Sequence, residues 1–102
     1  MRMISRGVLA GLAIGLLAAP GLAADAEQGR RLANSCTSCH GIEGRSVGAT
    51  PSLAGQAEAD LLAKLQAFKA GSVEATIMNR LARGYSDEEL AALAAYFASV
   101  TP

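Results

Sequence analysis

The chain has 102 residues and a formal net charge of zero, because nine lysines and arginines balance nine aspartates and glutamates. This length allows one small domain, and the absence of a basic surplus or a basic stripe excludes nucleic acid as a partner. Hydrophobic residues make up 51% of the chain, yet only 4% of the residues are aromatic and none is tryptophan. A domain this small, with so few large side chains, needs a further source of stability.

The first 24 residues have the organisation of a secretory signal peptide. Two arginines lie within the first six residues, an uncharged apolar run covers 7–19, and Pro20 is followed by small residues up to Asp25. An uncleaved membrane anchor is the alternative, but this run is shorter than the ~20 apolar residues that a spanning helix needs. We therefore expect cleavage after Ala23 or Ala24 and no stable membrane insertion afterwards.

Residues 25–102 are expected to form a single domain that starts with a short helix. Asp25 with Gln28 three residues later resembles a capping box, and apolar or small residues then repeat at spacings of three and four up to Cys36. Gly29 lies on this face, although glycine costs a helix roughly 1 kcal/mol relative to alanine. Either a close helix crossing requires this glycine or a short helix tolerates it, and the sequence leaves both explanations open.

The pentapeptide Cys36-Thr37-Ser38-Cys39-His40 is the attachment signature of a c-type haem. Two thiols three residues apart can reach both vinyl groups of one porphyrin, and the adjacent imidazole can bind its iron. The chain contains no other cysteine and no other histidine. One covalently attached haem c would also supply the apolar centre that the small domain lacks.

Three other kinds of site compete for this motif. A thioredoxin-like dithiol expects a preceding strand and a βαβ context, of which the sequence shows no sign. A zinc site needs four ligands, whereas the two cysteines and one histidine offer only three. A structural disulfide would suit a secreted protein but would leave the neighbouring histidine unexplained.

Residues 41–51 contain three glycines and end at Pro51, which predicts a loop. A loop at this place can bring a backbone carbonyl to the free N–H of His40, and such a hydrogen bond fixes the tautomer and raises the basicity of an iron ligand. Pro51 is the candidate for that carbonyl. The alternative is an ordinary turn proline.

Two further helices are predicted after this loop. The first covers 56–70 and ends at Gly71, and the second starts with the capping box formed by Ser86 and Glu89 and ends near Val100. The apolar face of the first helix is assigned to the core; it consists of Leu61, Leu62, Leu65 and Phe68.

Met78 lies between these helices, in a mixed segment at 72–83, and is the only methionine of residues 25–102. The chain has no second histidine, and its lysines lie on the predicted middle helix, so Met78 is the candidate for the second axial ligand of the iron. A thioether opposite an imidazole favours ferrous iron and raises the reduction potential. The alternative is a core methionine that fills a gap.

With these residues placed, the chain resembles the small class I bacterial cytochromes c. The matching segments are GRRLANSCTSCHG, TPSLAGQ, LQAFKAG and TIMNRLARGYSDEELAALAAYFA. The resemblance implies an all-α cytochrome c fold, with three to four helices wrapped around one covalently attached haem. It also implies Cys36 and Cys39 as haem anchors, with His40 and Met78 as axial ligands.

A narrower resemblance covers FKAGSVEATIMNRLARGYSDEEL and CHGIEGRSVGATPSLAG, which look like the haem subunit of flavocytochrome c sulfide dehydrogenase. That subunit accepts electrons from a flavoprotein that oxidises sulfide. The resemblance implies a periplasmic electron-transfer protein, not itself an enzyme, whose partner is such a flavoprotein or another redox protein. Some members carry two haem domains, whereas this chain has one motif. A free carrier that serves a terminal oxidase or reductase therefore remains an alternative, and a ligand-binding or peroxidatic haem protein is the least favoured one.

Overall fold

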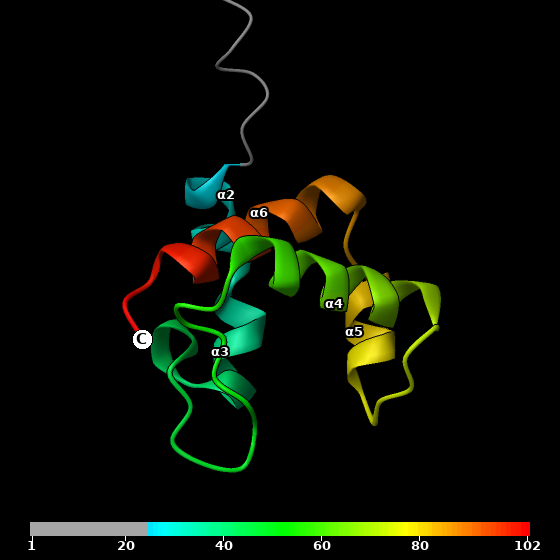
Figure 1. Cartoon of the computed structure of the whole chain (residues 1–102), viewed down its shortest axis with the longest axis horizontal. Helices are drawn as coiled ribbons and strands as arrows, with labels where there is room; N and C mark the ends of the chain where they lie inside the picture. Colours follow the sequence, from blue (N-terminus) through cyan, green and yellow to red (C-terminus); the bar gives the residue numbers. More distant parts are fainter. Residues whose placement is uncertain (1–24) are drawn as a thin grey trace, which may run out of the picture.

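The structure is a computed structural model that describes residues 25–102 (Figure 1), so the predicted signal peptide at 1–24 lies outside the described residues. The regular elements of residues 25–102 are all helical and no strand occurs among them, which confirms the all-α prediction. It has five α-helices, more than the three to four expected, and one 3-10 turn. These are α2 (Ala26–Leu32), α3 (Asn34–His40), the turn η3 (Ile42–Gly44), α4 (Glu58–Ala70), α5 (Met78–Arg83) and α6 (Asp87–Ser99).

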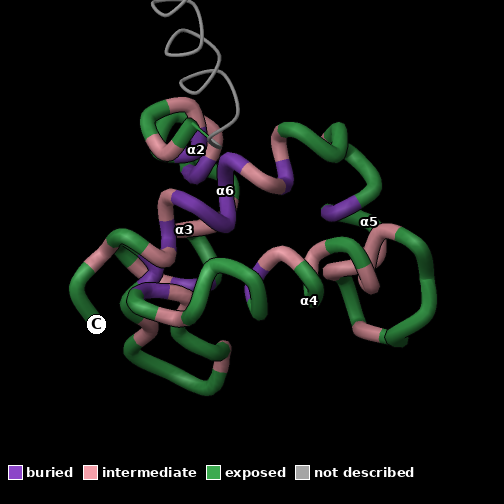
Figure 2. The backbone as a smooth tube through the Cα atoms, turned by 45° about the horizontal axis from the view of Figure 1, so that its top comes forward, coloured by how far each residue is buried: buried purple, intermediate pink, exposed green. Residues whose placement is uncertain are grey.

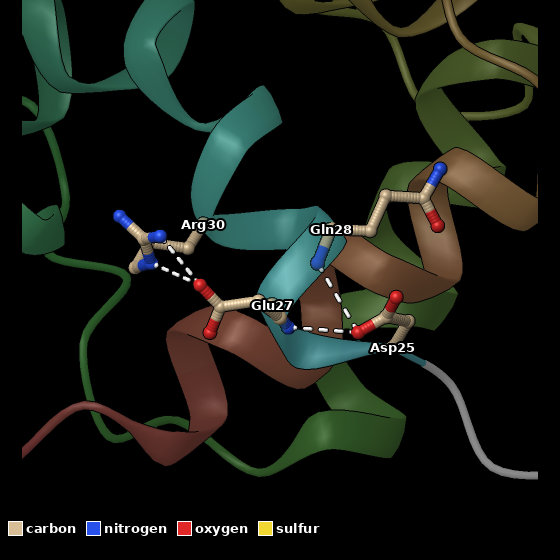
Figure 3. Close-up of polar contacts among 4 residues, drawn as sticks. All are labelled: Asp25, Glu27, Gln28 and Arg30. Carbon is tan, nitrogen blue, oxygen red and sulfur yellow. Dashed lines mark hydrogen bonds and ion pairs between the residues drawn. The ribbon is translucent and has the colours of Figure 1, made fainter.

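The first predicted helix begins where the sequence places it but is divided in two. A side-chain oxygen of Asp25 accepts hydrogen bonds from the backbone N–H groups of Glu27 (3.0 Å) and Gln28 (3.2 Å), as Figure 3 shows, and this caps α2. Glu27 also pairs with Arg30 on the exposed side of the same helix (Figure 3). α2 ends at Ala33, whose carbonyl accepts from two backbone N–H groups of α3 and so starts the next helix at once.

α2 crosses α6 at Gly29, which settles why a glycine occupies this helix. A Cβ atom at this position would lie 2.0 Å from the carbonyl oxygen of Ala92 and 2.8 Å from Cβ of Tyr96. The two helices lie against each other in Figure 1. The close crossing therefore requires glycine, and mere tolerance is not the explanation.

The later helices follow their predicted signals with small differences. α4 begins at Glu58, two residues later than expected, and ends at Gly71, whose φ of 81° is the left-handed conformation of a helix C-terminus. The capping box of α6 is complete, with bonds of 3.1 Å and 2.8 Å between Ser86 and Glu89. Two elements were not predicted, namely α5 in the mixed segment and the turn η3 in the loop after His40.

α6 forms the centre of the core. Figure 2 shows buried stretches along this helix, where one face packs on α2 and another on α4. The buried apolar cluster is small and contains Ala33, Leu61, Leu90, Leu93, Ala94 and Phe97. In the described residues no helix has both the length and the apolar character that crossing a membrane requires.

Candidate functional site

A cavity of about 470 Å³ lies between α3, α4, α5 and α6, next to the loop that follows η3. All the predicted site residues line it, namely Cys36, Cys39, His40, Pro51 and Met78. The remainder of its wall is mostly apolar and includes Leu53, Leu61, Leu65, Phe68, Leu93 and Phe97. Residues that are far apart in the sequence therefore meet in one apolar cavity with two thiols, one imidazole and one thioether on its wall.

His40 is the last residue of α3 and is 9% exposed. Its Nδ1 atom lies 2.6 Å from the carbonyl oxygen of Pro51, the contact for which the sequence offered this proline as a candidate. A carbonyl oxygen can only accept, so Nδ1 carries the hydrogen and the lone pair stays on Nε2. This is the tautomer that an imidazole needs when Nε2 is to bind a metal ion.

The turn after His40 brings Pro51 to the ring. Gly41 has a φ of 91°, and a Cβ atom there would lie 2.0 Å from the carbonyl oxygen of Arg45, so only glycine fits this reversal of the chain. The returning loop is then fastened by the backbone bond from Leu53 N to the carbonyl of Gly44, at 2.8 Å. The conformation of this loop thus fixes the position of the Pro51 carbonyl beside His40.

The two cysteines lie three residues apart on α3 and so share one face of the helix. Cys36 is half-buried and Cys39 is exposed, and no disulfide joins them. Burial raises the pKa of the Cys36 thiol above its ordinary value.

Met78 is the first residue of α5 and is half-buried at the cavity wall. Ile77 and Leu81 flank it there, with exposed fractions of 51% and 39%. Within residues 25–102, no three His, Cys, Asp or Glu side chains gather into a group that could hold a metal ion, which disfavours the zinc alternative. An iron held through a porphyrin needs only two axial ligands from the protein, and the cavity wall offers an imidazole and a thioether.

The structure adds a second role to one part of the sequence interpretation. The core assignment of the α4 apolar face is confirmed for Leu61, Leu62 and Leu65, which belong to the buried cluster or pack against it. Leu61, Leu65 and Phe68 also line the cavity. Periodicity cannot separate these two roles, because a core and an apolar cavity require the same side chains. Tyr85 was missed as well; its hydroxyl hydrogen-bonds to Ser35 at the cavity wall, across fifty residues of sequence.

The residues present fit a covalently attached haem c. The wall is apolar, as a porphyrin requires, two thiols stand on one helix face beside it, and the nitrogen and sulfur donors belong to different segments of the wall. A cavity of this kind at the centre of a small domain also accounts for the modest size of the buried cluster.

Comparisons with known proteins agree with this fit. The family model described as cytochrome c matches residues 26–101. The chain is 38% identical over 74 residues to the cytochrome subunit of sulfide dehydrogenase from Chlorobaculum tepidum, covering 72% of this chain and 67% of that protein. It is 35% identical over 81 residues to cytochrome c-554(548) from Halomonas halodenitrificans, covering 76% of this chain and 98% of that protein.

Among solved structures, reduced cytochrome c4 from Pseudomonas stutzeri superimposes with a TM-score of 0.73 and 38% sequence identity. The match covers 78% of this chain but 47% of cytochrome c4, so the chain spans about half the length of that relative. Sequence and structure thus point to the same family. The chain belongs to the cytochrome c family, whose members are electron-transfer proteins that carry covalently attached haem c.

Proposed function

We propose that the protein is a periplasmic one-electron carrier with one haem c, and that it accepts electrons from a flavoprotein sulfide dehydrogenase. The observation that carries the first part is the presence of His40, Met78 and both cysteines on the wall of one cavity. When bound, the haem supplies an iron that alternates between the ferric and ferrous states. Cys36 and Cys39 would provide the thioether anchors, and His40 and Met78 would provide the axial ligands.

The surroundings of these ligands support electron transfer and disfavour the binding of small molecules at the iron. The Pro51 carbonyl accepts from Nδ1 of His40, which orients the ring and leaves the Nε2 lone pair free for a metal ion. The wall of the site is mostly apolar, and Met78 would occupy the position that a peroxidatic or gas-binding haem leaves open.

The sulfide dehydrogenase partner is supported by the 38% identity to the cytochrome subunit from Chlorobaculum tepidum. A free carrier that serves a terminal oxidase or reductase is the second candidate, because cytochrome c-554(548) is matched over 98% of its own length. The two functions share the haem site and differ in the surface that the partner contacts.

The cavity opens beside an uncharged stretch of chain. No Asp, Glu, Lys or Arg occurs between Arg45 and Glu58, and within this stretch Val47 is fully exposed. Residues 25–102 carry seven basic and nine acidic side chains, a net charge of only −2 (7 − 9). Long-range attraction should therefore be weak, and contact with a partner should depend on apolar packing around the haem edge.

Rapid mixing of the oxidised cytochrome with the flavoprotein from the same source, followed by sulfide, tests the partner. We expect haem reduction much faster than by sulfide alone, with little dependence on ionic strength. Ala49→Glu, at an exposed position on the cavity wall, should slow the reduction, whereas Ala63→Glu, the same change at an exposed α4 position outside the cavity wall, should not. Reduction no faster than by sulfide alone would reject this partner and leave the free carrier.

A further inference from the structure

One side chain fastens the segment that carries Met78. Asn79, the next residue, accepts a hydrogen bond from the backbone N–H of Ala75 at 2.8 Å through Oδ1. Its Nδ2 atom donates to the carbonyl of Phe68 at 2.9 Å and to that of Val73 at 2.8 Å. A single side chain therefore joins α5, the connecting segment and the last turn of α4.

The three hydrogen-bond partners of Asn79 require an amide side chain at this position. They are one backbone donor and two backbone carbonyls, so the side chain must offer one acceptor and two hydrogens. A carboxylate of the same shape would keep the bond from Ala75 but would face two carbonyl oxygens without a hydrogen. An alanine would leave all three backbone groups without this partner.

The segment that Asn79 fastens, residues 71–77, has one other anchor on α4, namely Ser72, whose backbone N–H (3.0 Å) and hydroxyl (3.3 Å) both donate to the carbonyl of Ala67. The segment leaves α4 at Gly71, and both Val73 and Ile77 expose about half of their surface, with fractions of 47% and 51%. Ile77 precedes the first residue of α5, and no side chain caps that helix. Segments with few buried contacts open locally at a free energy well below that of global unfolding. The three hydrogen bonds of Asn79 should therefore supply a large share of the free energy that keeps residues 71–77 packed on α4.

We propose that Asn79 is a positioning residue that keeps residues 71–77 closed on α4 and thereby holds the Met78 sulfur at the iron in both oxidation states. The proposal rests on the axial role of Met78 proposed above. Because Met78 begins α5 directly beside Asn79, opening of the segment displaces both residues together. Asn79 thus keeps the sixth position closed to external ligands without touching the haem.

The test uses the holoprotein and two variants, Asn79→Asp and Asn79→Ala. Carbon monoxide binds ferrous haem only when the sixth position opens, so its binding rate reports the opening equilibrium. Each buried hydrogen bond changes such an equilibrium by roughly two- to tenfold. We expect both variants to bind carbon monoxide at least about fivefold faster than the wild type, and to weaken the red-edge charge-transfer band of ferric iron bound to a thioether.

Arg80→Gln is the matched control, because it changes the charge by the same amount as Asn79→Asp at the next residue. Arg80 makes no side-chain hydrogen bond or ion pair with any part of residues 25–102, and this control should behave as the wild type does. A rate increase in Arg80→Gln equal to that in Asn79→Asp would assign the effect to charge and overturn the proposal.

Met78→Ala separates failure of this proposal from failure of the axial assignment. If Met78→Ala leaves the band and the carbon monoxide rate unchanged, the axial assignment is wrong. If Met78→Ala opens the site while both Asn79 variants keep the wild-type rate and band, Asn79 has no positioning role.

A measurement on the wild-type holoprotein does not depend on whether a variant folds. The Ala75 amide should exchange its hydrogen at least about tenfold more slowly than that of Glu74, which has no hydrogen-bond partner in residues 25–102. Equal exchange of the two amides would contradict the proposal.

Discussion

Replacement of Gly29 by alanine should destabilise the protein, although helix propensity alone predicts the opposite. The new Cβ atom would lie 2.0 Å from the carbonyl oxygen and 2.6 Å from the carbonyl carbon of Ala92. These are backbone atoms of α6, which cannot rotate away as the end of a flexible side chain could. α2 and α6 must therefore move apart. This movement weakens the packing of α2 on α6.

The magnitude follows from two opposing terms. Alanine stabilises a helix by about 1 kcal/mol relative to glycine, whereas overpacking of a close contact costs about 1–3 kcal/mol. Because the clash involves backbone, we take the upper end of that range, which leaves a net loss of about 2 kcal/mol. For a domain of this size such a loss lowers the melting temperature by about 10 °C.

The assay is reversible thermal unfolding of the ferric holoprotein, followed by far-UV circular dichroism. Gly48→Ala is the matched control, since a Cβ atom at Gly48 meets nothing within 4 Å and the residue does not have a positive φ. This control should be neutral or slightly stabilising. A melting temperature of Gly29→Ala equal to or above that of the wild type would refute the close-crossing argument.

Three further predictions concern the haem, its ligand and α6. Cys36→Ala combined with Cys39→Ala should give a disordered or degraded product, because the small domain loses its apolar centre; a stable haem-free variant that melts cooperatively would contradict this. Met78→His should keep the haem low-spin and lower the reduction potential measured by redox titration, and an unchanged potential would argue against axial ligation. Ser86→Ala removes the capping box and should cost about 1 kcal/mol in guanidinium unfolding, whereas Ser72→Ala, two residues beyond α4 and bonded only to the Ala67 carbonyl at 3.3 Å through its exposed hydroxyl, should cost less.

Much of the site could be predicted because its chemistry is concentrated in short local signals. The motif from Cys36 to His40 specifies the cofactor by residue type and spacing, and Met78 is the only methionine of the described residues. The capping box at Ser86 and the glycine after α4 likewise act within a few residues of the helix end that they define. Such signals need no knowledge of the tertiary structure.

The remainder depends on contacts between distant segments. Asn79 and Tyr85 carry no signal in the sequence. The partners of Asn79 are backbone groups, which any residue type supplies, and the partner of Tyr85 is a serine fifty residues away that only the fold brings near. The division between α2 and α3 at Ala33 was missed for a related reason, since apolar spacing continues unbroken across it. The role of Gly29 stayed open until the crossing with α6 was seen.

The measurement that tests the central claim most directly is the NMR spectrum of the ferrous holoprotein with methyl-labelled methionine. Residues 25–102 contain one methionine, so the cleaved protein gives one methyl signal. If Met78 binds the iron opposite His40, its methyl group lies over the porphyrin ring, and the ring current moves the signal far upfield. A methionine signal at its ordinary position would contradict the proposed ligation and, with it, the proposed closed sixth position.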